Sequence, residues 1–220
     1  MALDSFVSSW SFTYDIAFEL VFAVVSLILA LFAFKLYRIT DENKSKLFGI
    51  SFLLISISYM VQFISNLLVI TKLNEQICAA AGLSSVNSVS YFGAYIHFLL
   101  MLTGFAVLLY MTFNIKHPEV LLFLLILSIV TLVMSGNEFS TFYLLSTLFL
   151  SFITWHFVKN YVRNRQKLTL LVALAFSFFL FGSFHFLISV NHQFFFILGY
   201  FLELIAYVLL SINLYMVHKK

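Results

Sequence analysis

The stretch that decides the fold is residues 14–46, YDIAFELVFAVVSLILALFAFKLYRITDENKSK. Most of it is an apolar run long enough to cross a bilayer, which takes about 20 residues in an α-helix. The acidic residue Asp15 lies at its start, and basic residues surround its end, namely Lys35, Arg38, Lys44 and Lys46. A long apolar run with basic residues at one end is typical of a membrane-spanning helix whose basic end faces the cytoplasm.

The rest of the chain has the same character. Of its 220 residues, 63% are hydrophobic, 10% are charged and 29 are Phe, which leaves too little polar surface to coat a water-soluble globule. The hydropathy pattern predicts an all-α fold, a polytopic bundle of seven transmembrane helices that forms a single domain over residues 1–220. The expected helices are 14–37, 47–70, 89–113, 120–136, 141–161, 168–190 and 194–217.

The basic residues predict the orientation of this bundle. Of the 12 Lys and Arg residues, only Lys72 falls on the side opposite to the others. The N-terminus is therefore expected outside and the C-terminus in the cytoplasm, in a multi-pass protein of the cell membrane. The net charge of +3 reflects this topology, so no nucleic-acid partner is expected. The first apolar run lacks a basic leader, which predicts a transmembrane helix that is retained and not a signal peptide that is cleaved.

The order of the helices suggests three helices, a linker helix and three more. The turn at 34–38 recurs at 157–161, each followed by a polar loop and further basic residues. Continuing this register makes His97 equivalent to Glu203 and brings Asn66 near His185. If the two triplets are a repeat, they run parallel, because the single linker restores the direction of the chain.

Four Glu and His residues lie in the outer halves of the expected spans, namely Glu19, His97, His185 and Glu203. A charged group near the middle of a span costs about 2.5–3.5 kcal/mol, so such groups normally face the bundle interior and pair with one another. Counting along the helices places all four in one layer of the outer half. We therefore expect an outward-facing intramembrane pocket, with a ligand-binding set that comprises Glu19, Gln62, Asn66, Tyr95, His97, His185, Tyr200, Glu203 and Tyr207.

Glycines accompany three of these ionisable residues on the same helical face. Gly93 precedes His97 by one turn, Gly182 precedes His185, and Gly199 precedes Glu203. A glycine on such a face allows two helix backbones to approach closely or leaves a hollow for a ligand. Both interpretations stay open from the sequence.

Two cofactors fit these residue types. His97, His185 and Glu203 are candidate zinc ligands, and zinc in an open site would acidify a bound water and give a hydrolase. The sequence has no HExxH motif and no pair of His residues one turn apart, so no catalytic residues are assigned and an enzyme is not the expected class. Alternatively, His97 and His185 would ligate a b-type haem in a slot lined by phenylalanines of 176–186.

In topology the chain resembles the microbial rhodopsins, with seven closely connected helices, an outside N-terminus and its longest outer loop between the second and third helices. The resemblance puts Tyr207 where that family has its retinal lysine, with Glu203 one turn away. The last helix has no lysine before Lys219, so no retinal Schiff base is expected. The chain is also similar to the three-plus-one-plus-three sugar transporters, although Pro118 is its only proline.

No long polar segment remains for a soluble domain, so any output must pass through a partner or across the membrane. We expect a receptor- or sensor-like protein that binds a ligand in the outer pocket and signals through a membrane or cytoplasmic partner. A transporter of a small solute or of protons is the alternative. A metal-dependent intramembrane hydrolase and a haem protein are further alternatives, and the sequence leaves the ligand and any homo-oligomer open.

Overall fold

The structure is a computed structural model that describes residues 9–70, 86–115, 117–189 and 193–218. The predicted outer connection 71–88 lies mostly outside these residues. The described part is helical and contains no strand, and its seven helices confirm the predicted all-α architecture. Their bounds are α1 Ser9–Thr40, α2 Asn43–Ile70, α4 Val86–Thr112, α5 Pro118–Val133, α6 Glu138–Asn164, α7 Lys167–Ile188 and α8 Gln193–His218.

Local sequence signals explain where several helices begin and end. Pro118 lies in the first turn of α5, where its missing N–H would have had no partner in the helix. The Asn137 side chain caps α6 by accepting a hydrogen bond from the Ser140 N–H at 3.2 Å. At the opposite end, α1 and α6 each stop at a residue in the left-handed conformation, Asp41 with φ 53° and Arg165 with φ 54°.

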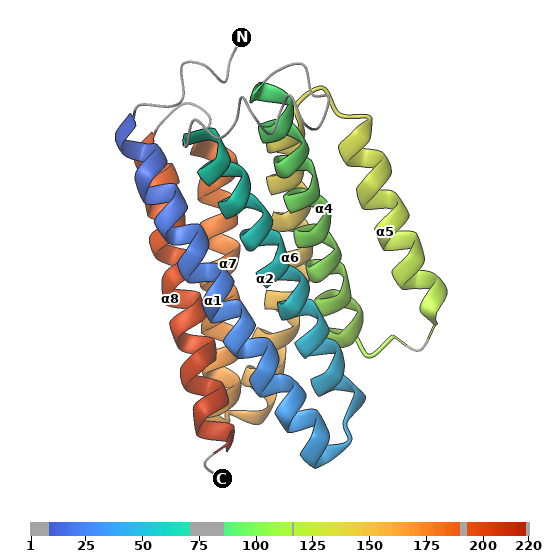
Figure 1. Cartoon of the computed structure of the whole chain (residues 1–220). Coiled ribbons are helices and arrows are strands. Elements are labelled where there is room, and N and C mark those ends of the chain that lie inside the picture. The colour runs from blue at the N-terminus through green and yellow to red at the C-terminus, as the bar shows by residue number, and fades with distance from the viewer. Residues whose placement is uncertain (1–8, 71–85, 116, 190–192, 219–220) are drawn as a thin grey trace.

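Six of the helices, all except α5, pack in a closed ring, and Figure 1 shows this bundle from the side. Around the ring, α1 packs on α2, α2 on α4, α4 on α6, α6 on α7, α7 on α8 and α8 on α1. Helix α5 lies outside the ring against α4 and α6. It runs from the lower to the upper end of the bundle, so α4 and α6 on either side of it both descend. The triplets α1–α2–α4 and α6–α7–α8 are therefore parallel, as the expected repeat requires.

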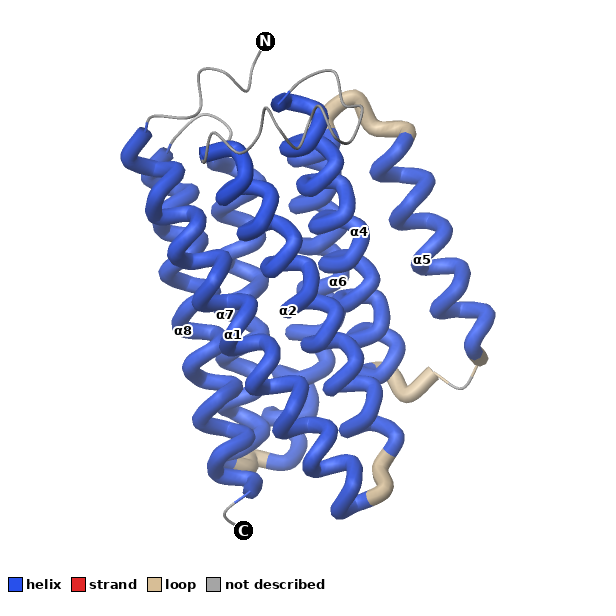
Figure 2. The backbone as a smooth tube through the Cα atoms, in the orientation of Figure 1, coloured by secondary structure: helices blue, strands red, loops and turns tan. Residues whose placement is uncertain are grey.

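Six helices are long and apolar enough to cross a membrane, each with 22 to 27 residues in the candidate span. They are all the helices of the ring, whereas α5 has only 16 residues. The short connections between α1 and α2 and between α6 and α7 lie at the lower end of the bundle, as the tan segments in Figure 2 show. A multi-pass membrane protein follows from these lengths and from the apolar outer surface.

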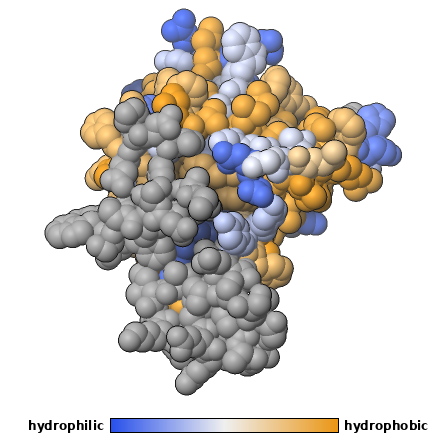
Figure 3. All heavy atoms as spheres, turned by 90° about the horizontal axis from the view of Figure 1, so that it is seen from above, coloured by the Kyte–Doolittle hydropathy of each residue, from blue (hydrophilic) through white to orange (hydrophobic). Residues whose placement is uncertain are grey.

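The outer surface of the bundle is rich in large apolar side chains. Seen from the upper end, orange hydrophobic atoms dominate the described surface, and blue hydrophilic atoms form separate patches among them (Figure 3). On α5, Leu122, Phe123 and Val133 are each about six-tenths exposed. Such side chains are suited to contact with lipid tails, which is how a ring with an apolar exterior is solvated in a bilayer.

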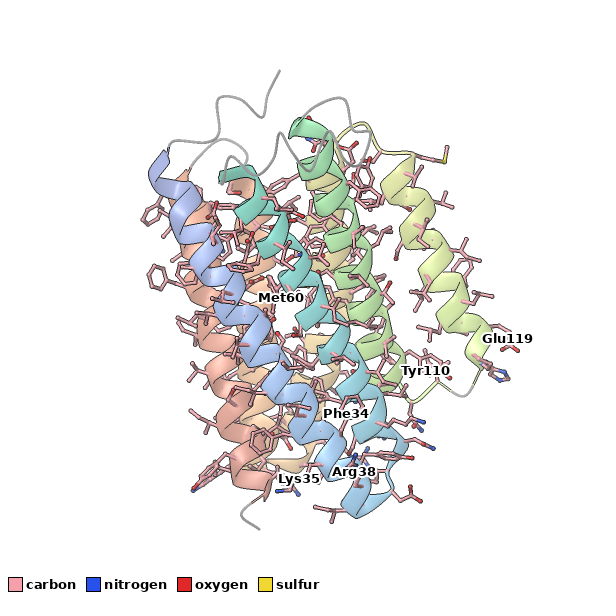
Figure 4. All side chains as sticks on the ribbon, viewed as in Figure 1. Phe34, Lys35, Arg38, Met60, Tyr110 and Glu119 are labelled. Atoms are coloured by element: carbon pink, nitrogen blue, oxygen red, sulfur yellow. The ribbon has the colours of Figure 1, made fainter. Side chains whose placement is uncertain are left out.

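The labelled charged side chains lie where the topology predicts them. Lys35 and Arg38 are at the lower end of α1, and Glu119 is at the lower end of α5 (Figure 4). The basic residues of the α6–α7 connection share this end, because that connection also lies there. Both basic clusters are thus on one side of the ring.

Small residues let neighbouring helices of the ring approach closely. Ser26, Ala30 and Ala33 of α1 are all buried, at 0%, 0% and 2% exposure. Across the α2–α4 contact, a Cβ added at Gly104 would come within 2.8 Å of Ile55 Cγ1 and 3.1 Å of the Ser51 carbonyl oxygen. Helix packing in membranes relies on small residues at such contacts, because lipid provides no hydrophobic driving force between helices.

We expect Gly104→Ala to destabilise the bundle by about 1–3 kcal/mol, because the Ser51 backbone cannot move aside without shifting α2. Thermal unfolding of the purified protein in detergent measures this loss. Gly136→Ala is the matched control, since a Cβ at Gly136 meets nothing within 4 Å. Equal unfolding midpoints for both variants would contradict the close α2–α4 contact.

Candidate functional site

The centre of the ring contains a buried carboxyl group that is bonded across it. Glu203 of α8 is 7% exposed, and its Oε2 accepts a hydrogen bond from the Tyr59 hydroxyl of α2 at 3.0 Å. The phenol belongs to the first triplet and the carboxyl group to the second. This bond therefore connects the two triplets through the middle of the protein.

His97 of α4 lies beside this pair. Its ring centroid is 5.6 Å from that of Tyr59, and its Nδ1 lies 3.1 Å from the Ser58 carbonyl oxygen and 2.8 Å from Ser58 Oγ. The Ser58 hydroxyl donates to the His97 carbonyl oxygen at 2.8 Å. Because a carbonyl oxygen only accepts, the contact with Ser58 O requires the proton on Nδ1, which leaves Nε2 as an acceptor.

A second polar group lies nearer the upper end, between α1 and α2. Glu19 is 5% exposed, and its Oε1 accepts from Asn66 Nδ2 at 2.7 Å. Gln62 Nε2 donates to Asn66 Oδ1 at 3.4 Å. The remaining oxygens, Glu19 Oε2 and Gln62 Oε1, are buried and accept no hydrogen bond from any residue that the structure describes. Unsatisfied acceptors of this kind each cost about 1–3 kcal/mol.

The polar residues thus occupy two levels rather than the single layer expected from the sequence. Asn66, which bonds Glu19, lies seven residues above Tyr59, which bonds Glu203. Seven residues of helix rise roughly 10 Å. The sequence does not show which side chains bond across the ring, and Glu19 pairs with Asn66 whereas Glu203 pairs with Tyr59, two turns lower on α2.

Aromatic rings fill the space around both levels. Tyr200 stacks on Phe18 with centroids 5.1 Å apart, and Tyr207 stacks on Phe22 at the same separation. Tyr207 is 1% exposed, and its ring also packs edge-on against Phe179 with centroids 4.8 Å apart. Both predicted tyrosines of α8 therefore border the interior, where they close the α1–α8 contact.

The glycines support close packing. A Cβ at Gly199 would meet the Phe186 ring at 2.9 Å, and one at Gly93 would overlap the Ser65 side chain. Gly182 of α7 faces Glu203, whose Cγ would lie 3.1 Å from an added Cβ. The missing side chain at Gly182 thus makes room for the carboxylate side chain of the neighbouring helix, not for His185 on its own helix.

Two predicted residues lie away from this interior. His185 is half-buried, and its Nδ1 contacts the Phe181 carbonyl oxygen of its own helix at 2.7 Å. Tyr95 donates its hydroxyl proton to Glu138 Oε1 at 2.7 Å and so connects α4 to the first turn of α6. The structure brings together Glu19, Gln62 and Asn66 at the upper level and His97 and Glu203 at the lower one.

The proposed zinc and haem ligands are not assembled. Among the described residues, no three His, Cys, Asp or Glu side chains are grouped so as to hold a metal ion. His97 contacts the rings of Tyr59, Phe98 and Phe142. His185 contacts those of Phe184 and Phe195. The two imidazoles have no common neighbour among these rings, because His185 is turned toward its own backbone.

Both buried carboxyl groups are enclosed rather than open to the outside. Glu19 and Glu203 are 5% and 7% exposed. A small apolar dent lies between α1 and α8 and is lined by Phe32, Leu36, Leu214 and Val217. This dent lies near the lower end, away from the polar residues, so it contributes nothing to them.

Sequence reasoning missed Tyr59, which makes the central hydrogen bond. Tyrosine is common at membrane interfaces, so its type gave no signal. Its spacing did: Tyr59, Gln62 and Asn66 occupy positions i, i+3 and i+7 of α2, which is one helical face. Asp15, one turn before Glu19 on α1, was likewise assigned only to the outer side.

Comparison with known proteins adds no relative. No family model matches the chain, and no curated protein and no solved structure matches it. The resemblance to microbial rhodopsins in topology stays a prediction.

We expect Tyr59→Phe to destabilise the protein by about 1–3 kcal/mol, because it removes the donor and leaves the Glu203 carboxyl group buried without a partner. Thermal or denaturant unfolding in detergent measures the loss. Tyr215→Phe, at a tyrosine that is 63% exposed, is the matched control. If Tyr59→Phe unfolds like the wild type, the central bond does not stabilise the fold.

Proposed function

We propose that the chain crosses the membrane seven times, with its N-terminus outside and its C-terminus in the cytoplasm. One observation supports the number of crossings and another supports the orientation. Helix α5 runs between two descending helices, so the chain needs it to return to the upper end. Both clusters of basic residues lie at the lower end, where Figure 4 labels Lys35 and Arg38, and basic residues favour the cytoplasmic side.

The single cysteine tests this orientation. Cys78 follows α2 and precedes α4 in the chain, so we expect a membrane-impermeant maleimide to label it in intact cells. A Cys78→Ser protein carrying Glu42→Cys, in the α1–α2 connection, is expected to be labelled only after permeabilisation. The reverse pattern would invert the topology.

We propose further that the protein is receptor- or sensor-like and binds a ligand in the upper half of the ring, signalling through a membrane or cytoplasmic partner. The main observation in support of this proposal is where the buried Glu and His side chains lie. Glu19, His97 and Glu203 are the buried Glu and His residues of the described chain, and each belongs to one of the two polar levels. Ionisable groups inside a membrane are costly and normally serve a function.

The lower half of the ring favours recognition over conduction. Its buried side chains are mainly apolar, among them Phe52, Leu108, Ile153 and Phe176. Below Tyr207, the described buried residues include no Asp, Glu, Lys, Arg or His. A ligand that enters from outside would thus meet polar groups first and an apolar floor beneath them.

A ligand screen tests the binding function. Wild type, Glu203→Gln and Glu119→Gln are placed in lipid nanodiscs with amino acids, monosaccharides, polyamines or nucleosides. We expect at least one class to raise the unfolding temperature of the wild type, since a ligand at 100 times its Kd adds about 2.7 kcal/mol. The surface control Glu119→Gln, at a residue whose side chain is 78% exposed, is expected to keep the response and Glu203→Gln to lose it. No response to any class would contradict the proposal.

The parallel triplets favour one second candidate, a transporter of a small solute or of protons. Parallel three-helix repeats joined by a linker occur in transporters, where the substrate site lies between them. The lower ends of α1 and α6 match: Asp41 N–H donates to Tyr37 O at 2.8 Å and Arg165 N–H to Tyr161 O at 2.7 Å. Counterflow in proteoliposomes separates the two functions. Uptake lost in Glu203→Gln supports transport, and stabilisation by a ligand without flux supports the receptor.

A further inference from the structure

The upper polar level has an excess of hydrogen-bond acceptors. Asn66 donates to Glu19 and accepts from Gln62, so its amide is used on both sides. What remains are two buried oxygens that have no hydrogen-bond partner among the described residues, Oε2 of Glu19 and Oε1 of Gln62. Both belong to residues bonded to the same amide. A ligand that fits here must therefore supply donors or positive charge.

The charged residues around this level also favour a cationic ligand. Asp15 lies one turn before Glu19 on α1, half-buried and close enough to interact with it electrostatically. No Lys or Arg is among the buried residues of the described chain. In the described part of the chain, two carboxyl groups thus lie at this level without a buried base beside them. Like charges this close disfavour one another in a low dielectric unless a cation or a proton intervenes.

The donor set restricts which cation fits. Calcium prefers six to eight oxygen ligands, and magnesium requires a near-ideal octahedron. The described residues contain no group of three His, Cys, Asp or Glu side chains that suits a metal ion of this kind. Two carboxyl groups and one amide oxygen offer fewer oxygen ligands than calcium or magnesium requires, so they suit a monovalent cation better than a divalent one.

We propose that Asp15, Glu19 and Gln62 form a site for a monovalent cation, either an alkali metal ion or a primary ammonium group. Glu19 Oε2 and Gln62 Oε1 contact the cation, Asp15 supplies the second negative charge, and Asn66 positions the two contacting side chains. The inference rests on the proposed function for the location of the ligand site in the upper half of the ring. It adds the charge and the class of the ligand.

The test measures the unfolding temperature of the nanodisc protein in zwitterionic lipid at constant chloride concentration. The probes are sodium, potassium and methylammonium chloride, each titrated against N-methylglucamine chloride, whose cation is too bulky for the site. We expect one small cation to raise the midpoint with a saturable dose dependence in wild type and Glu119→Gln. Sodium or potassium as the active probe identifies an inorganic ion, and methylammonium identifies an ammonium group.

Two variants locate the effect. Glu19→Gln keeps an oxygen for the Asn66 bond and removes the charge, and we expect it to weaken cation binding at least tenfold. Gln62→Met removes the amide oxygen and leaves both carboxyl groups. Weaker cation binding by this variant therefore indicates that Gln62 contacts the cation directly, and that the charge of the carboxyl groups is not the whole cause of binding. The wild-type titration and Gln62→Met still decide the matter if Glu19→Gln does not fold.

The outcomes also separate this inference from the proposed function. Identical midpoints in all four salts, or full cation binding in both variants, would overturn the cation site and leave protonated carboxyl groups as the explanation. If the cations are without effect while a neutral or anionic compound stabilises the wild type but not Glu203→Gln, the receptor function stands and only the cation site fails. If no compound and no cation raises the unfolding temperature, both the receptor function and the cation site are wrong.

Discussion

The interior of this bundle is governed by the fact that hydrocarbon offers no hydrogen-bond partners. Every polar side chain that leaves water must be satisfied by another part of the protein or remain costly. Glu203 meets this condition with Tyr59 across the ring, and His97 meets it with Ser58 on the neighbouring helix. At the upper level Glu19 meets it only in part. These hydrogen bonds connect α2 with α8, α2 with α4 and α1 with α2.

Two aromatic contacts and one hydrogen bond hold the two triplets together. Helices α1 and α8 meet through the Phe18–Tyr200 stack, and α4 and α6 meet through the Phe98–Phe142 stack with centroids 4.4 Å apart. Each contact joins the first helix of one triplet to the last helix of the other, as a parallel pseudo-twofold arrangement requires. Between these aromatic contacts, the Tyr59–Glu203 bond spans the centre. Aromatic stacking thus connects the triplets at the α1–α8 and α4–α6 contacts, and the Tyr59–Glu203 hydrogen bond connects them in the centre of the ring.

The sequence predicted the helices and the burial of Glu19, His97 and Glu203, because span length and the cost of a charge in lipid are one-dimensional properties. It did not predict which way each polar side chain turns. In helices that are apolar on all sides, periodicity no longer distinguishes an inner face from a lipid face. His185 could therefore bond its own Phe181 carbonyl oxygen, and Tyr95 could reach Glu138 at the rim. Tyr59 was missed for the same reason.

Helix α5 shows how two parallel triplets are joined in one chain. It packs outside the ring, against α4 and α6, and it reverses the chain between two units of the same direction. The ring closes without it. Two three-helix units of the same direction can follow one another in a chain only if a connector returns from the lower to the upper end, and such a connector needs no interior surface of its own.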